Sequence, residues 1–322
     1  MSFSDCLFKQ MEKNFEKIIC TEKFSSANSG DSIKTDEKAL VTFAVWGDPQ
    51  VSFISPLRSA RVYKAVEDIR KGDKLDALVL CGDITEYGAK CEYKFVKKLL
   101  DNLGGKCEKI FAVPGNHDVR LRNFKKQVKR FTQFVNSVNN GDADDNSYYY
   151  KRDINGYRFI MMGTDRCTFE ASYINANQLK RLEEDIISVP KNKPVFVFNH
   201  QALKHTNGLP VTFLGKGKWR GSVGRESEKL RKVLEKRPNV FYITGHLHYG
   251  TSQYTFENLG NIKALSVPTV GVINHGKFNT MTQGYLISVY DDKVILRSRI
   301  FGESKYTPNT VSNAFIEVPI DL

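Results

Sequence analysis

The sequence predicts an α/β fold in which mixed β-sheets are covered by helices. Two observations lead to this prediction. Short apolar runs alternate with charged, helix-like segments along most of the chain, and beyond residue 260 the pattern becomes mostly strands. Strand–helix alternation favours parallel strands, whereas consecutive strands favour antiparallel pairing, so both kinds of pairing are expected. A chain of 322 residues can bury the core that such sheets need.

Hydrophobic periodicity places the individual elements. The apolar runs predict strands at residues 41–46, 75–81, 110–113, 157–162, 194–198, 240–244, 263–268, 284–290, 293–300 and 314–320. Helical spacing predicts helices at about 58–71, 89–103, 121–138, 177–187 and 226–236.

The pattern of the N-terminal segment predicts an amphipathic helix. Its apolar face is formed by Leu7, Phe8, Met11, Phe15, Ile18 and Ile19. Residues 25–38 are small, polar and rich in turn formers, so we expect them to be a linker. We therefore predict an N-terminal helix and linker over residues 1–38 and one main domain over residues 39–322.

The chain is basic, with 48 Lys and Arg against 36 Asp and Glu and a net charge of +12. This charge favours anionic partners but does not choose among phosphate esters, nucleic acid and a membrane surface. No stretch approaches the roughly 20 consecutive apolar residues of a membrane-spanning helix, and the N-terminus lacks the apolar core of a signal peptide. We expect a cytoplasmic protein without a membrane span.

Functional side chains follow five of the predicted strands at the points where these strands end. They are Asp48, Gln50, Asp83, Asn116, His117, Asp118, His200, His246 and His248. In layered α/β folds this edge is where sites assemble, because rigid strands position short loops. Carboxylate, amide oxygen and imidazole without thiolate suit Mn, Fe, Zn or Mg rather than a structural zinc. The pattern therefore predicts a metal site.

The series Asp48-Pro49-Gln50, Gly82-Asp83, Gly115-Asn116-His117-Asp118, His200 and Gly245-His246-Leu247-His248 resembles the calcineurin-like metallophosphoesterase family over about residues 40–290. The resemblance implies a four-layer α/β/β/α sandwich with two metal ions at the shared edge of its two mixed sheets. It implies one metal held by Asp48, Gln50, Asp83 and His248, and another held by Asp83, Asn116, His200 and His246. His117 would be the acid beside the scissile bond, oriented by Asp118.

Gln50 departs from the commoner family motif, which has His at this position. An amide oxygen is a harder, neutral and weaker ligand than imidazole. We therefore favour Mn or Fe over a tight pair of zinc ions, with Zn and Mg left open.

Basic residues supply candidate substrate contacts. Segment 201–225 follows His200, is rich in Gly, Lys and Arg, and contains no acidic residue. We expect it to be a loop over the site, with Lys218 and Arg220 as substrate-binding residues and Trp219 as an apolar contact. Arg120, close after the His117 motif, is a further candidate for contact with the substrate phosphate.

These observations predict a metal-dependent phosphoesterase that hydrolyses phosphate mono- or diesters with a water activated by two metals. Two alternatives are open. Repair nucleases share such a site and the chain is basic, although those nucleases normally keep His where Gln50 lies. A scaffold is the other alternative, because one retromer subunit keeps the fold without the catalytic residues; the presence of His117 argues against it. The predicted partner is a phosphorylated substrate, and the oligomeric state is not predicted.

Overall fold

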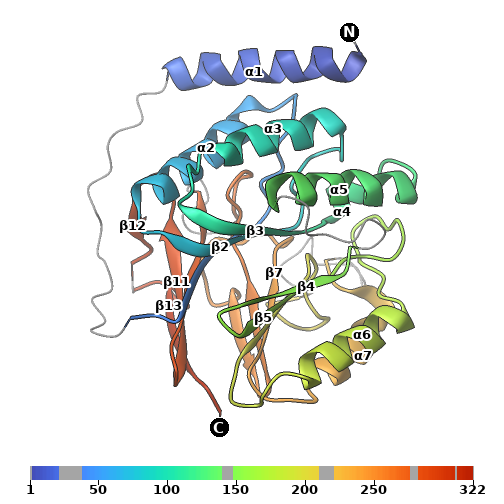
Figure 1. Ribbon diagram of the computed structural model, residues 1–322, viewed down its shortest axis with the longest axis vertical. Coiled ribbons are helices and arrows are strands. Elements are labelled where there is room, and N and C mark those ends of the chain that lie inside the picture. The colour runs from blue at the N-terminus through green and yellow to red at the C-terminus, as the bar shows by residue number, and fades with distance from the viewer. Residues whose placement is uncertain are drawn as a thin grey trace.

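The structure is a computed structural model, and it describes residues 2–21, 38–139, 148–209, 221–275, 282–308 and 310–321. The described strands form two sheets packed face to face, with helices on both outer sides (Figure 1). This arrangement confirms the four-layer α/β/β/α sandwich.

The first sheet combines parallel and antiparallel pairing. Its strand order is β12-β11-β10-β1-β2-β3, and β13 also pairs with β11. β1, β2 and β3 are parallel, since a helix separates each from the next, whereas β10 to β13 pair antiparallel. Its strands are β1 (Val41–Trp46), β2 (Leu75–Cys81), β3 (Cys107–Val113), β10 (Gln283–Val289), β11 (Lys293–Ile300), β12 (Lys305–Tyr306) and β13 (Phe315–Pro319).

The second sheet has the order β4-β5-β6-β7-β9-β8. Its four central strands are parallel, and the two edge strands are antiparallel to them. Its strands are β4 (Tyr150–Ile154), β5 (Tyr157–Met161), β6 (Val195–Phe198), β7 (Val240–Thr244), β8 (Phe256–Leu259) and β9 (Ile262–Ser266). The carboxyl ends of β5, β6, β7 and β9 therefore meet at one edge.

Aromatic side chains fill the space between the sheets. Phe43 of β1 is fully buried, and its ring centroid lies 4.9 Å from that of Phe159 on β5 and 5.0 Å from that of Phe196 on β6. A second apolar cluster, which includes Ile160, Leu182 and Leu234, joins the second sheet to the helices that cover it. Burial on both faces explains why the central strands are continuous apolar runs in the sequence.

Helices α2 (Pro56–Lys71), α3 (Lys90–Asp101) and α5 (Phe124–Asn139) cover the first sheet (Figure 1). The predicted N-terminal helix is present as α1 (Phe3–Thr21), which packs across α2 and α3. The Phe15 ring lies 5.5 Å from that of Tyr63 on α2 and 5.4 Å from that of Phe95 on α3. The side chains of Ile18 and Ile19, and residues 25–37 of the expected linker, lie outside the described part, so the domain boundary at residue 38 stays a prediction.

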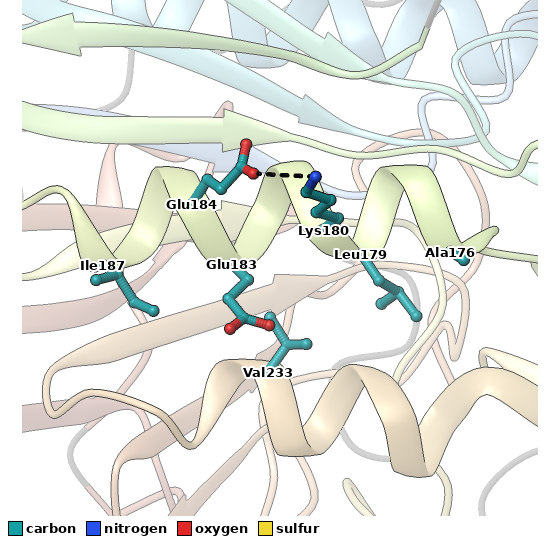
Figure 2. Close-up of a pocket in the computed structure, with 7 residues that line it drawn as sticks. All are labelled: Ala176, Leu179, Lys180, Glu183, Glu184, Ile187 and Val233. Carbon is teal, nitrogen blue, oxygen red and sulfur yellow. Dashed lines mark ion pairs between the residues drawn. The ribbon is translucent and has the colours of Figure 1, made fainter.

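On the outer face of the second sheet lie α6 (Ala176–Ile187) and α7 (Ser227–Leu234) (Figure 1). A groove runs between them and is lined by Ala176, Leu179, Lys180, Glu183, Glu184, Ile187 and Val233 (Figure 2). Lys180 and Glu184 form an ion pair of 3.9 Å along its rim. All the lining residues belong to these two helices, so this groove is separate from the strand ends that carry the predicted site.

The structure corrects several predicted boundaries. The helix expected at 121–138 is α5, which begins only at Phe124, and the single turn α4 (Asn116–Val119) before it was not predicted. Strands β4, β8 and β12 were not predicted, because they lie at sheet edges and carry polar residues instead of an apolar run. Within the described residues, no helix combines the length and the apolar character needed to cross a membrane.

Candidate metal centre

The loops that follow β1, β2, β3, β6 and β7 bring the predicted metal-binding side chains together. Six of them are at most 3% exposed: Asp48, Gln50, Asp83, Asn116, His200 and His246. The exposed fraction of the His248 side chain is 20%, so the site opens to solvent on this side. Since these strands belong to both sheets, the site lies where the two sheets share an edge.

The acidic and histidine side chains form two groups that share one carboxylate. The candidate ligand atoms of Asp83, His200 and His246 lie within 4.8 Å of one another, and so do those of Asp48, Asp83 and His248. Asp83 is the member common to both groups. Each group contains three of the four residues in one of the sets that the family resemblance implies, and Gln50 and Asn116 belong to neither group.

The orientation of His200 suits a metal ligand. Its Nδ1 donates a hydrogen bond to the carbonyl oxygen of Cys81 at 3.0 Å, which turns Nε2 toward Asp83 Oδ2 at 3.3 Å. A histidine that binds metal commonly anchors its other nitrogen on a backbone carbonyl in this way. Burial disfavours the imidazolium, but the carboxylates of Asp83 and Asp48 outweigh it and raise the pKa of His200 to about 10. This cluster therefore attracts a cation, either a proton or a metal ion.

Two buried amide oxygens complete the donor set. Among the described residues, neither Gln50 Oε1 nor Asn116 Oδ1 has a hydrogen-bond partner. Leaving a buried acceptor unsatisfied costs about 1–3 kcal/mol. A metal ion would satisfy both oxygens, so the residues present fit a mixed oxygen and nitrogen site.

Backbone strain is concentrated at the same residues. The φ angles of Asp48, Gln50, Asp83, His246 and His248 lie between 40° and 71°, in the left-handed region. Residues other than glycine seldom adopt this conformation, and clusters of such residues are typical of functional sites.

Close packing explains why two positions of the motifs are occupied by glycine. A Cβ atom on Gly82 would lie 2.1 Å from His200 Nδ1, and one on Gly115 would lie 2.0 Å from Asp83 Oδ1. Either contact would displace a candidate ligand, so glycine is required at both positions for steric reasons.

His117 lies beside the two groups. Its Nε2 is 3.8 Å from Asp83 Oδ2, and its Nδ1 is 3.1 Å from Glu86 Oε1. Burial lowers the pKa of His117, but Asp83 and Glu86 outweigh this effect, and the net shift is upward. The ring is therefore held in a charged environment that favours the imidazolium.

The structure corrects the role expected of Asp118. Its carboxylate accepts hydrogen bonds from the backbone N–H groups of Ile84, Thr85 and Gly115 at 2.9–3.0 Å, and from the Tyr93 hydroxyl at 3.1 Å. Asp118 thus ties the loop after β2 to the loop after β3, and Glu86 makes the contact with His117. The physical reason is the helical turn of α4, in which consecutive side chains point in different directions.

Arg120 lies at the site, between two acidic side chains. Its Nη2 is 2.8 Å from His117 Nδ1 and 3.6 Å from Glu86 Oε1, and its Nη1 is 3.6 Å from Glu170 Oε1. Lys218, Trp219 and Arg220 lie outside the described residues. Sequence reasoning missed Glu86 and Glu170. Glu86 follows shortly after Asp83 in the loop after β2, and this position could have identified it as a site residue.

Comparisons with known proteins agree with this fold. The family model for calcineurin-like phosphoesterases matches residues 41–250. A curated protein of Arcobacter nitrofigilis, named probable glycerophosphodiester phosphodiesterase GpdQ, is 26% identical over 182 residues, which cover 54% of this chain and 57% of that protein.

The described fold is similar to that of the purple acid phosphatase PPD1 from yellow lupin seeds, with a TM-score of 0.59 and 12% sequence identity. The match covers 87% of this chain and 53% of the lupin chain, so this chain spans little more than half the length of either relative. The family match extends from β1 to just beyond His248 and includes every candidate metal ligand. The chain belongs to the calcineurin-like phosphoesterase family.

Proposed function

We propose that this protein is a phosphoesterase that hydrolyses phosphate mono- or diesters with the help of two bound metal ions. The observation that carries the proposal is the pair of side-chain groups that share Asp83. Two cations held at about 3.5–4 Å from each other would activate a water and neutralise charge on the phosphoryl group.

Each residue has a distinct part in this proposal. One ion would be held by Asp48, Gln50, Asp83 and His248, and the other by Asp83, Asn116, His200 and His246. The donor set without thiolate favours Mn or Fe, as expected from the sequence. His117 would give a proton to the leaving oxygen, because its ring borders Asp83 and its environment favours the charged form.

Two positioning residues support His117. Glu86 would keep the ring oriented through the contact to Nδ1, and Arg120 would limit the movement of Glu86. A scaffold would have no need of this arrangement, so the presence of His117 beside Glu86 favours an enzyme.

The test is a substrate panel with metal-reconstituted protein. It compares p-nitrophenyl phosphate, bis(p-nitrophenyl) phosphate, glycerophosphodiesters, cyclic nucleotides, phosphopeptides and DNA. Asp83→Ala serves as the inactive variant, and Asp153→Ala, a change on the partly exposed strand β4, serves as the matched control. We expect hydrolysis by the wild type and by Asp153→Ala only. Equal rates for all three proteins on every ester would refute the proposal.

A further inference from the structure

The loop between β5 and α6 places an acidic side chain at the mouth of the metal centre. Asn116 Nδ2 donates a hydrogen bond to Glu170 Oε2 at 3.4 Å, and His246 Nε2 lies 3.9 Å from the same oxygen. The side chain of Glu170 is 23% exposed, so it borders both the buried cluster and solvent. The sequence motifs do not include Glu170, which is 54 residues from Asn116 along the chain.

The position of Glu170 is fixed by its neighbours. Gln201, the residue after His200, donates a side-chain hydrogen bond to the Glu170 carbonyl oxygen at 3.3 Å. On the same loop, the Thr168 hydroxyl donates to the carbonyl oxygen of Ala171. These contacts hold the loop against the candidate ligand His200, so the carboxylate is part of the wall of the site.

The negative charge of Glu170 is only partly neutralised by its neighbours. Among the described residues, the nearest guanidinium is that of Arg120, at 3.6 Å, which exceeds normal hydrogen-bond length. Arg120 is also 3.6 Å from Glu86, so one guanidinium is shared between two carboxylates. The carboxylate thus keeps acceptor capacity toward the mouth, and among the described residues no close ion pair neutralises it.

We propose that Glu170 is a specificity-determining residue that selects singly charged phosphodiesters over doubly charged phosphomonoesters. The inference rests on the proposed function, since it concerns which ester the same site accepts. A phosphate group bound at the Asn116–His246 side of the centre would lie close to this carboxylate. Repulsion between like charges grows with the charge on phosphorus, and a monoester dianion carries one charge more than a diester.

The kinetic test removes the charge of the Glu170 side chain and keeps its shape. Glu170→Gln retains an oxygen that can accept from Asn116, whereas Glu170→Asp retains the charge. We expect the ratio of kcat/KM for bis(p-nitrophenyl) phosphate to that for p-nitrophenyl phosphate to fall roughly tenfold in Glu170→Gln. The ratio should stay near the wild-type value in Glu170→Asp and in the control Glu184→Gln, an exposed acid on α6.

A binding measurement separates this inference from the proposed function. Calorimetry at about pH 8, where phosphate is largely a dianion, gives the Kd of inorganic phosphate and of dimethyl phosphate for the metal-loaded proteins. We expect Glu170→Gln to bind phosphate roughly tenfold more tightly and dimethyl phosphate equally well. If the wild type hydrolyses neither ester while this shift appears, the proposed function is wrong and the charge selection holds.

Two results would overturn the inference. In the first, neither the kinetic ratio nor the Kd of phosphate changes in Glu170→Gln. In the second, this variant loses metal by elemental analysis, which would make Glu170 a metal-holding residue.

Discussion

Asp83 and His200 face each other across the boundary between the two sheets, with Asp83 Oδ2 3.3 Å from His200 Nε2. Asp83 follows β2 of the first sheet, and His200 follows β6 of the second. A cation held by both residues would therefore link the two halves of the sandwich. Metal binding and stability should be coupled for this reason, because such an ion would bind the folded arrangement alone.

Metal stoichiometry should follow the sharing of Asp83. After reconstitution with Mn or Fe, we expect about two ions per wild-type chain by elemental analysis. His248→Ala removes a member of one group only and should leave about one ion, whereas Asp83→Ala removes the shared member and should leave less than one. The control Asp153→Ala should keep both. Equal metal content in His248→Ala and Asp83→Ala would contradict the sharing.

Gln50 should determine metal preference. If its buried amide oxygen binds metal, Gln50→His exchanges a hard neutral ligand for imidazole and should shift relative affinity toward zinc, with some activity retained. Competition titrations with Mn, Fe and Zn measure this shift. Unchanged relative affinities would mean that Gln50 does not contact the metal.

His117 should separate catalysis from metal binding. His117→Ala is expected to keep its metal content and to lower kcat roughly 10²–10⁴-fold on esters with a poor leaving group. The loss should be smaller for p-nitrophenyl esters, whose leaving oxygen hardly needs a proton. If metal is lost together with activity, His117 is a ligand rather than an acid.

The buried carboxyl of Glu92 should make stability depend on pH. Its Oε2 accepts from the backbone N–H groups of Tyr87 at 3.0 Å and Ala89 at 3.1 Å. Burial outweighs these donors and raises the pKa of Glu92 from 4.5 to about 8. Between these two values the folded state keeps a proton that the unfolded chain has released, so the free energy of unfolding falls as pH rises, by up to about 1.4 kcal/mol per pH unit.

Glu92→Gln should flatten this part of the profile. Denaturant unfolding of the metal-free protein between about pH 5 and pH 8 measures it, since metal binding then adds no pH dependence of its own. Glu184→Gln, on the exposed face of α6, is the control and should keep the wild-type slope. The same slope in Glu92→Gln would show that this carboxyl titrates normally.

The sequence was informative where the backbone alone determines position. Parallel strands of one sheet end at a common edge, so the motifs after β1, β2 and β3 could be expected to meet, and so could those after β6 and β7. That the two edges coincide was implied by the family resemblance alone. Side-chain direction within a turn could not be inferred, and the proximity of Asp118 to His117 in sequence was therefore misleading. Glu170 was missed because its contact with Asn116 depends on how a separate loop packs.

Helix α1 has a consequence for the solution behaviour of the protein. Its aromatic contacts cover Tyr63 and Phe95 on the outer helices of the first sheet. A chain that begins after the linker would leave this apolar area open to water, and such patches promote self-association. We therefore expect a chain shortened to residues 39–322 to aggregate more readily, as measured by light scattering, while its hydrolytic rate per folded molecule is unaffected. The helix would then act as a solubility element that limits colloidal association.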